Sequence, residues 1–122
     1  MSCIFCNIDK SRMILENEDA FVIYDAFPVS KGHMLIIPKK HIENYFEADE
    51  EIKLKLWKLV DKCKEMADKK FTPQGYNIGI NCGEAAGQTV MHLHIHLIPR
   101  YSGDIENPRG GVRGVIPDKR IY

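Results

Sequence analysis

Two apolar runs in the first forty residues predict two strands. Residues 20–25 (AFVIYD) and 33–38 (HMLIIP) are rich in β-branched and large apolar side chains, which favour an extended chain. Pro28 and Gly32 lie between the two runs and are typical of a turn. We therefore interpret the two segments as an antiparallel pair, the second strand of which ends at Pro38.

The clearest helical signal lies in residues 49–69. Apolar residues recur there at steps of three and four, a spacing that places them on one face of a helix. Asp49 is a suitable N-cap, and Lys69 and Lys70 suit the negative end of the helix dipole. The predicted apolar face consists of Ile52, Leu56, Leu59, Val60, Cys63 and Ala67. We interpret the charged residues between them as a solvated face.

Two further strands are predicted in the second half of the chain. Residues 75–81 (GYNIGIN) are a strand candidate, and residues 89–98 (TVMHLHIHLI) form a longer run that is expected to end at Pro99. Residues 102–122 show no periodicity and are expected to be an irregular tail. Together these elements predict a single α+β domain over residues 1–122, with an antiparallel sheet and one main helix.

Composition and charge narrow the class of protein. The chain has 122 residues, of which 44% are hydrophobic and 28% charged, as is ordinary for one globular domain. Seventeen basic and seventeen acidic residues cancel, which argues against nucleic acid and anionic membranes as partners. No apolar run approaches the roughly 18 residues that span a bilayer, and no signal-peptide pattern is present. We expect a cytoplasmic protein with reduced thiols.

Three of the five histidines alternate with apolar residues in the segment MHLHIHLIP. On a regular strand His92, His94 and His96 would share one face. The opposite face would carry apolar residues that pack into the core, namely Met91, Leu93, Ile95 and Leu97. A polar sheet surface that happens to use histidine would be the preferred explanation for one such residue, but it is a poor explanation for three in alternation. A single metal bound by all three is disfavoured, because the outer two Cα atoms of five strand residues lie about 13 Å apart. We therefore expect the histidines to have different roles, such as nucleophile and proton carrier.

The loop before the histidine segment is a candidate phosphate site. Residues 81–89 (NCGEAAGQT) are small enough for backbone N–H groups to approach an anion, and Asn81, Gln88 and Thr89 offer side-chain donors. An ordinary glycine-containing turn is the alternative. A phosphate cradle next to a row of histidines indicates phosphoryl or nucleotidyl transfer.

Four segments together resemble the histidine triad (HIT) superfamily. The segment GQTVMHLHIHLIPR contains the pattern His-φ-His-φ-His-φ-φ, in which φ is apolar. Residues 3–8 (CIFCNI), 24–42 (YDAFPVSKGHMLIIPKKHI) and 81–90 (NCGEAAGQTV) are similar to further blocks of that family, in the family's order. The resemblance implies a HIT-like fold, in which an antiparallel β-sheet meander carries one main α-helix, and a homodimer.

The resemblance also implies an activity. Such proteins act at the α-phosphate of purine nucleotides, usually adenosine nucleotides, through a nucleotidyl-histidine intermediate that water hydrolyses to the nucleoside monophosphate. By position in the motif, His94 is the nucleophile and His96 contacts the phosphate and the leaving group. The positions that match substrate-binding residues are Phe5, Ile8, Ile23 and Ala26 for the base, Asp25 for the ribose, and Asn81, Gly87, Gln88 and Thr89 for the phosphate. We interpret His33 as a hydrogen-bonded strand residue.

The spacing Cys3-x-x-Cys6 is half of a tetrahedral zinc site, although free cysteines are common in a reduced cytosol. Resemblance to bacterial HIT proteins and to galactose-1-phosphate uridylyltransferases implies that His41 and His92 complete the ligand set. A site closed by four protein ligands would make this zinc structural. Cys63 is expected in the core, and Cys82 is interpreted as a small loop residue.

The sequence does not decide which leaving group the protein removes from the α-phosphate. Hint-like members of the superfamily cleave P–N bonds, and Fhit-like members cleave dinucleoside polyphosphates. The segment PRGGVRGVIP is closer to the second group, where Arg100, Arg109 and Arg113 would neutralise a longer phosphate chain unless they are solvated tail charges. Two alternatives remain: a nucleotide-binding or sensing scaffold with negligible turnover, and a nucleotidyl transferase. His-Leu-His in place of the uridylyltransferases' His-Pro-His weighs against the transferase.

Overall fold

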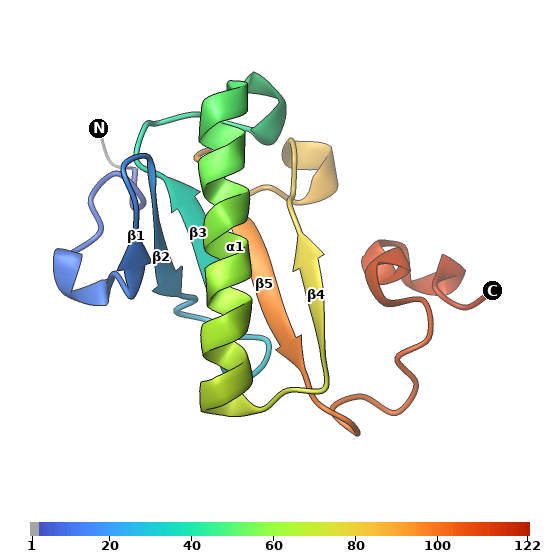
Figure 1. Cartoon of the computed structure of the whole chain (residues 1–122). Coiled ribbons are helices and arrows are strands. Elements are labelled where there is room, and N and C mark those ends of the chain that lie inside the picture. Colours follow the sequence, from blue (N-terminus) through green and yellow to red (C-terminus); the bar gives the residue numbers. More distant parts are fainter. Residues whose placement is uncertain (1–2) are drawn as a thin grey trace.

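The computed structural model describes residues 3–122, which form one antiparallel five-stranded sheet with a long helix across one face (Figure 1). The strands are β1 (Leu15–Glu16), β2 (Ala20–Tyr24), β3 (Met34–Pro38), β4 (Gly75–Gly79) and β5 (Ile95–Arg100), and the helix is α1 (Glu50–Phe71). Short 3-10 turns lie at η1 (Lys10–Arg12), η2 (Tyr45–Glu47), η3 (Glu84–Ala86), η4 (Gly111–Val115) and η5 (Pro117–Lys119). The predicted α+β class, with one main helix, is confirmed.

The first predicted strand pair is an antiparallel hairpin, in which Val22 lies opposite Ile36. Its connection closes against the end of α1. Gly32 has φ +88°, and a Cβ atom at this position would lie 2.7 Å from the Phe71 ring. Glycine is therefore required twice, once for the left-handed backbone and once for the close approach of the helix.

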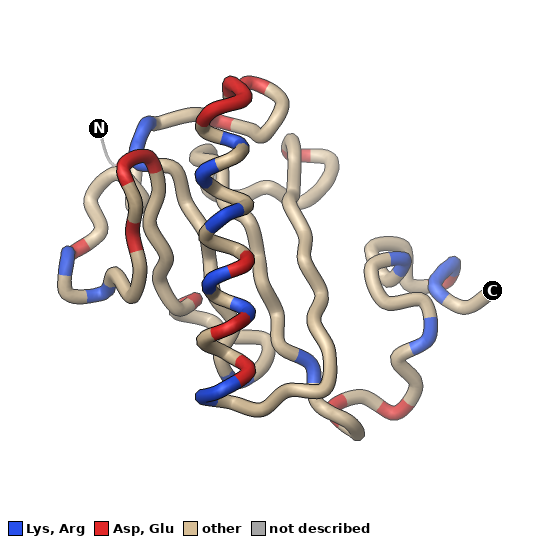
Figure 2. The backbone as a smooth tube through the Cα atoms, in the orientation of Figure 1, with Lys and Arg blue, Asp and Glu red and all other residues tan. Residues whose placement is uncertain are grey.

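The helix begins and packs as its sequence predicts. Asp49 caps it by accepting a hydrogen bond from the Ile52 N–H at 2.9 Å. The buried residues of α1 are the six predicted ones: Ile52, Leu56, Leu59, Val60, Cys63 and Ala67. The chain leaves α1 at Thr72, whose φ of +48° is left-handed. Both acidic and basic residues lie along the helix (Figure 2). No helix of the described residues is long and apolar enough to cross a membrane.

The central strands are buried on both faces of the sheet. One face packs against α1 through residues such as Val22 and Ile36. The other face carries Phe21, Ile23, Leu35 and Ile37, which pack around Phe5 of the N-terminal segment. This double burial explains why β2 and β3 are continuous apolar runs rather than alternating ones.

The strand order is β1-β2-β3-β5-β4, so the last strand in the sequence lies inside the sheet. The chain meanders through the first three strands, crosses along α1 to the far edge, forms β4 and returns as β5. Met34 of β3 and Ile78 of β4 both lie opposite Leu97, which fixes β5 from both sides. β4 pairs with β5 on one side and forms the edge of the sheet on the other. The homodimer expected from the sequence stays a prediction.

The strand predicted over residues 89–98 is wrong at both ends. It begins at Ile95, because the preceding chain leaves the sheet and the Leu93 N–H donates instead to the carbonyl of Ile42 at 2.7 Å. Leu93, Ile95 and Leu97 are buried as expected, but Met91 is 37% exposed. The strand also runs through Pro99 to Arg100.

Pro99 is tolerated because its ring nitrogen points away from β4. The carbonyl of Pro99 accepts a hydrogen bond from Ser30 Oγ at 2.6 Å, on the side opposite β4. In a strand the nitrogen and the carbonyl of one residue point to the same side, so the missing N–H removes no hydrogen bond to β4.

Residues 102–122 are irregular, as expected, and the tail lies beyond β4 (Figure 1). Its shape comes from its own contacts: Arg120 Nη1 donates to the carbonyls of Asn107 and Arg109, both at 2.6 Å. A second arginine, Arg113, donates to the carbonyl of Lys119 at 2.8 Å. The tail therefore folds back on itself rather than over the sheet.

We expect Leu56→Ala to lower the free energy of unfolding by about 2–5 kcal/mol, because Leu56 is fully buried between α1 and the sheet. The matched control is Leu54→Ala on the same helix, where the side chain is 54% exposed and the expected loss is below about 1 kcal/mol. Urea denaturation measures both. Equal losses would show that α1 does not pack by this face.

Candidate functional site

A cavity of about 730 Å³ opens between the N-terminal segment, the β2–β3 turn and the start of β5. Its deep wall is apolar and consists of Phe5, Ile8, Ile23 and Leu35. Its polar side carries Asp25, Thr89, His94 and His96. Of the predicted substrate-binding and catalytic residues, the structure brings these eight to the cavity: Phe5, Ile8, Ile23, Asp25, Ala26, Thr89, His94 and His96.

His94 is held with one ring nitrogen free. Its Nδ1 lies 2.9 Å from the carbonyl oxygen of His92. A carbonyl only accepts hydrogen bonds, so the proton of the neutral ring is on Nδ1 and Nε2 keeps its lone pair. The edge of the Phe5 ring packs against the imidazole with a centroid distance of 5.1 Å. In this tautomer the lone pair of His94 is on Nε2, the arrangement that a nucleophilic imidazole needs.

His96 is oriented by His33, a residue to which the sequence assigned no chemistry. The Val29 N–H donates to His33 Nδ1 at 3.0 Å, so the proton of a neutral His33 is on Nε2. That Nε2–H lies 2.9 Å from His96 Nδ1, which accepts it. The proton of His96 is then on its Nε2. The contact between His33 and His96 depends on the pairing of β3 with β5, in which Leu35 lies opposite His96. No spacing within the sequence predicts it.

Both of these histidines are neutral near pH 7. Burial lowers the pKa of His96 to about 4, and positive charge on His94 or His33 would act in the same direction, while Asp25 opposes them. Burial also lowers the pKa of His33, although Asp25 Oδ2 lies 3.5 Å from its Nε2. The contact between Asp25 and His33 is therefore not an ion pair at neutral pH.

Asp25 is fixed at the rim of the cavity with one oxygen available. Its Oδ1 accepts the N–H of Phe27 at 2.9 Å. Among the described residues, its Oδ2 has only the longer contact to His33, whose proton is directed at His96. The carboxylate can therefore accept hydrogen bonds from hydroxyl groups of a ligand.

The loop of residues 81–88 contributes less than expected. Gln88 is buried, and its Nε2 donates to the carbonyls of Glu43 and Val90 at 2.7 and 3.2 Å. Both amide protons are used in this way and Oε1 accepts the Gly83 N–H at 2.8 Å, so the side chain of Gln88 shapes the loop and does not line the cavity. Asn81 and Gly87 do not line the cavity either; Gly87 supplies the left-handed turn, with φ +91°.

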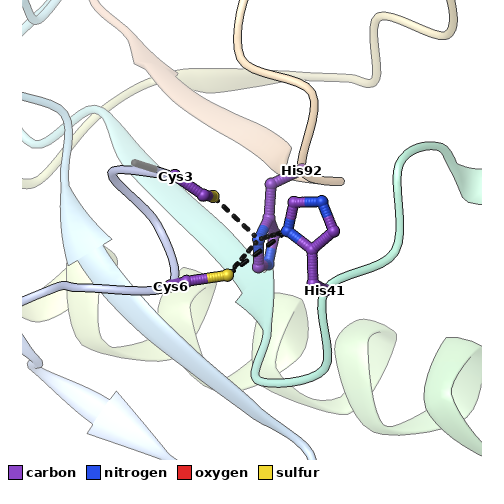
Figure 3. Close-up of side chains that lie close together, drawn as sticks. All are labelled: Cys3, Cys6, His41 and His92. Carbon is purple, nitrogen blue, oxygen red and sulfur yellow. Dashed lines mark hydrogen bonds between the residues drawn. The ribbon is translucent and has the colours of Figure 1, made fainter. Parts of the chain in front are cut away.

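Two cysteines and two histidines gather beside the cavity (Figure 3). His92 Nδ1 lies 3.4 Å from Cys3 Sγ and 3.5 Å from Cys6 Sγ. His41 Nδ1 lies 3.3 Å from Cys6 Sγ and 3.2 Å from His92 Nδ1. All four donor atoms lie within 4.8 Å of one another. The four residues selected from the sequence as ligands thus converge on one point.

His92 is prepared to act as a ligand. Its Nε2–H donates to the carbonyl of Pro38 at 2.8 Å, so Nδ1 is unprotonated and faces the two sulfur atoms. The side chain is fully buried, and burial lowers its pKa. His92 and His94 lie before β5, which begins at Ile95, so they do not share a face through regular strand geometry. The Phe5 ring nevertheless contacts both imidazoles.

Three arginines that could neutralise a phosphate chain, Arg100 at the end of β5 and Arg109 and Arg113 in the tail, lie outside the cavity. Arg100 pairs with Asp104 through two bonds of 2.8 Å and lowers the pKa of that carboxyl. Arg113 is bound to the tail's own carbonyls. Neither they nor Arg109 line the cavity of this chain, so within one chain they do not neutralise a phosphate bound there.

The model of the HIT domain family matches residues 8–103. The chain belongs to the HIT family. An uncharacterised HIT-like protein of Mycoplasma pneumoniae is 48% identical over 107 residues, which cover 82% of this chain and 72% of that protein. The adenosine 5′-monophosphoramidase of Schizosaccharomyces pombe is 38% identical, with 82% and 75% covered. The bis(5′-adenosyl)-triphosphatase of Dictyostelium discoideum is 33% identical, with 82% and 67% covered.

Solved structures of this HIT family have the same fold. A HIT family protein of Bacillus anthracis superposes with a TM-score of 0.79 at 39% identity, covering 84% of this chain and 76% of that one. A zinc-bound histidine triad family protein of Mycobacterium smegmatis superposes with a TM-score of 0.80 at 35% identity, covering 88% and 81%.

We expect the free energy of unfolding to fall as the pH drops from 6.5 toward about 4. In this interval an unfolded histidine takes up a proton, whereas folded His96 resists protonation until about pH 4. A His96→Gln variant should lose less stability between about pH 7.5 and 5, by on the order of 1 kcal/mol after allowance for solvent screening. Urea denaturation at equal metal content tests this. Identical losses in the two proteins would contradict the neutral state of His96.

Proposed function

We propose that this HIT protein is a nucleotide hydrolase that acts at the α-phosphate of adenosine phosphoramidates or dinucleoside polyphosphates and releases AMP. The observation that carries the proposal is the free Nε2 of His94 in a cavity that also presents an apolar slot and a carboxylate. Relatives named as a phosphoramidase and as a bis(5′-adenosyl)-triphosphatase support the same class of substrate.

The cavity suits an adenosine nucleotide. Phe5, Ile8, Ile23 and Ala26 form a slot for the flat base, whose faces are apolar. Ribose hydroxyls would donate to the available oxygen of Asp25, a charge-assisted hydrogen bond. The α-phosphate would then lie toward Thr89, His94 and His96, on the polar side of the cavity.

The reaction has two displacements at phosphorus. His94 Nε2 would attack the α-phosphorus, forming a P–N bond as the bond to the leaving group breaks and the leaving group takes up a proton. Water would then attack the same phosphorus, breaking the bond to His94 and releasing AMP. His96 stays neutral, so its Nε2–H stabilises charge on the phosphate or leaving group as a hydrogen-bond donor.

We also propose that Cys3, Cys6, His41 and His92 hold a structural Zn²⁺. Tetrahedral zinc, with bonds of about 2.0 Å to nitrogen and 2.3 Å to sulfur, separates two nitrogens by about 3.3 Å and a sulfur from a nitrogen by about 3.5 Å. The corresponding distances are 3.2 Å and 3.3–3.5 Å. Four protein ligands leave no position for substrate, so zinc would hold the N-terminal segment in place. The zinc-bound Mycobacterium smegmatis relative supports the assignment.

Replacement of His94 by alanine should lower kcat/KM by at least about 10³-fold, because the nucleophile is lost. Wild type, His94→Ala and the surface control Leu54→Ala are each mixed with adenosine 5′-phosphoramidate or diadenosine tetraphosphate. Rapid quenching without acid and intact-mass spectrometry should show an adenylyl adduct on wild type and on the control, but not on His94→Ala. The substrate with the faster burst identifies the preferred leaving group.

Two outcomes would overturn the hydrolase proposal. AMP binding with neither adduct nor turnover on either substrate would indicate a nucleotide-binding or sensing scaffold. ADP formed in place of AMP when inorganic phosphate is added would show that phosphate outcompetes water for the intermediate, as in a nucleotidyl transferase.

Purified protein should contain about one Zn²⁺ per chain. Its removal should lower the free energy of unfolding by about 4 kcal/mol relative to protein at a free zinc concentration about a thousand times Kd. Metal analysis and thermal melting before and after chelation measure both quantities. Cys6→Ser should lose the metal, whereas the matched control Cys82→Ser should keep it, because Cys82 lies outside the cluster. Zinc bound equally by both variants would refute the assignment.

A further inference from the structure

The N-terminal segment of residues 3–12 forms one wall of the cavity but has few attachments to the sheet. In the described part of the chain, the first backbone hydrogen bond that joins this end to the sheet runs from Ile14 N to Val22 O, at 2.8 Å. Before it, the segment is tied down by side chains. Lys10 pairs with Glu16 at 3.8 Å, and Cys3 and Cys6 contact His41 and His92. The position of this wall therefore depends on the two sulfur atoms and on the packing of Phe5 against the sheet.

Phe5 connects the sulfur atoms to the nucleotide cavity. It lies between the two cysteines in the sequence, and its buried side chain packs on the sheet beside Ile23. Its ring meets the ring of His92 at a centroid distance of 5.9 Å and that of His94 at 5.1 Å. It also lines the cavity. One side chain thus contacts a metal-cluster histidine, the proposed nucleophile and the proposed base slot.

The two cysteines are placed to react with an oxidant. Cys6 is exposed and Cys3 is half-buried, and their sulfur atoms lie within 4.8 Å of each other. A pair spaced by two residues on a turn needs only a local rearrangement to form a disulfide. Cys63, by contrast, is fully buried in the core, away from any oxidant in the solvent.

We propose that Cys3 and Cys6 form a peroxide-sensitive pair whose oxidation to a disulfide displaces Phe5 and weakens nucleotide binding. The effect on the cavity rests on the nucleotide site proposed above. Metal binding and the disulfide exclude each other, because the ligands of zinc are thiolates and a disulfide sulfur carries no such charge. The reduced, metal-bound segment holds Phe5 against the cavity, and the oxidised segment does not.

The oxidation balances with one hydrogen peroxide. The Cys6 thiolate attacks one peroxide oxygen, the O–O bond breaks, and a sulfenic acid and hydroxide form. The Cys3 thiolate then attacks the sulfur of Cys6, the S–O bond breaks, and a second hydroxide leaves with formation of the S–S bond. The two sulfur atoms lose two electrons in total, and the peroxide gains them. A dithiol reductant reverses the change.

The test uses the full chain, reduced and loaded with one equivalent of Zn²⁺, before and after treatment with hydrogen peroxide. A chromogenic chelator measures zinc release, and mass spectrometry with peptide mapping identifies the disulfide. Calorimetric titration with AMP measures the nucleotide affinity. We expect a Cys3–Cys6 disulfide, release of the zinc and AMP binding weakened about tenfold, or about 1.4 kcal/mol. Dithiothreitol with added zinc should restore the affinity.

Variants separate the steps of the proposal. Cys82→Ser should respond to peroxide as wild type does, and Cys6→Ser should show no change in AMP affinity on oxidation. Phe5→Ala should release zinc on oxidation but bind AMP equally before and after, because the connecting side chain is absent. Phe5→Leu, which keeps an apolar side chain at this position, should retain part of the response. Circular dichroism checks that each variant is folded.

The outcomes distinguish this proposal from the one on which it rests. Reduced, zinc-loaded protein that does not bind AMP would overturn the nucleotide site itself. Equal AMP binding before and after formation of the Cys3–Cys6 disulfide would overturn only the coupling. A disulfide that involves Cys63 or Cys82, or no disulfide at all, would refute the assignment of the reactive pair.

Discussion

Main-chain hydrogen bonds decide which nitrogen of each histidine carries a proton, and the chemistry of the site depends on this. The Pro38 carbonyl holds the proton of His92 on Nε2, which leaves Nδ1 for the cysteine cluster. The carbonyl of His92 holds the proton of the neutral His94 ring on Nδ1, which leaves the lone pair on Nε2, the atom proposed as the nucleophile. If the proton of His92 moved to Nδ1, the proposed metal ligand would be lost. If the proton of His94 moved to Nε2, the proposed nucleophile would be lost, although neither side chain had changed.

The tautomer of the third histidine, His96, is fixed by a side chain and not by a carbonyl group. The Val29 N–H fixes the tautomer of His33, and His33 then fixes that of His96. Burial keeps both rings neutral, so the pair donates a hydrogen bond toward the cavity without adding positive charge. Backbone atoms of a packed sheet and its turns are rigid, and the site is thereby organised before any ligand binds.

The two faces of the sheet have different supports. The helix covers one face and depends on many buried aliphatic contacts, whereas the short N-terminal segment covers the other around Phe5. A wall held by so few groups is stable only while those groups stay in place. The cavity with His94 and His96 lies on this second face, and the proposed coupling between the two cysteines and a bound nucleotide would act through this wall.

The sequence by itself determined the local elements of this protein. The strands β2 and β3, the helix with its cap at Asp49, the six buried helix residues and the four residues of the cluster could all be predicted. Their signals are local periodicity, capping and the resemblance to a known motif. Only the tertiary structure decided where the histidine strand begins, that His33 lies behind His96, and that Gln88 supports the loop. These outcomes depend on partners far away in the sequence, such as Ile42 for Leu93 and Glu43 for Gln88. Periodicity describes one segment at a time, whereas the hydrogen bonds that end a strand or use up an amide are chosen by the packing of several segments together.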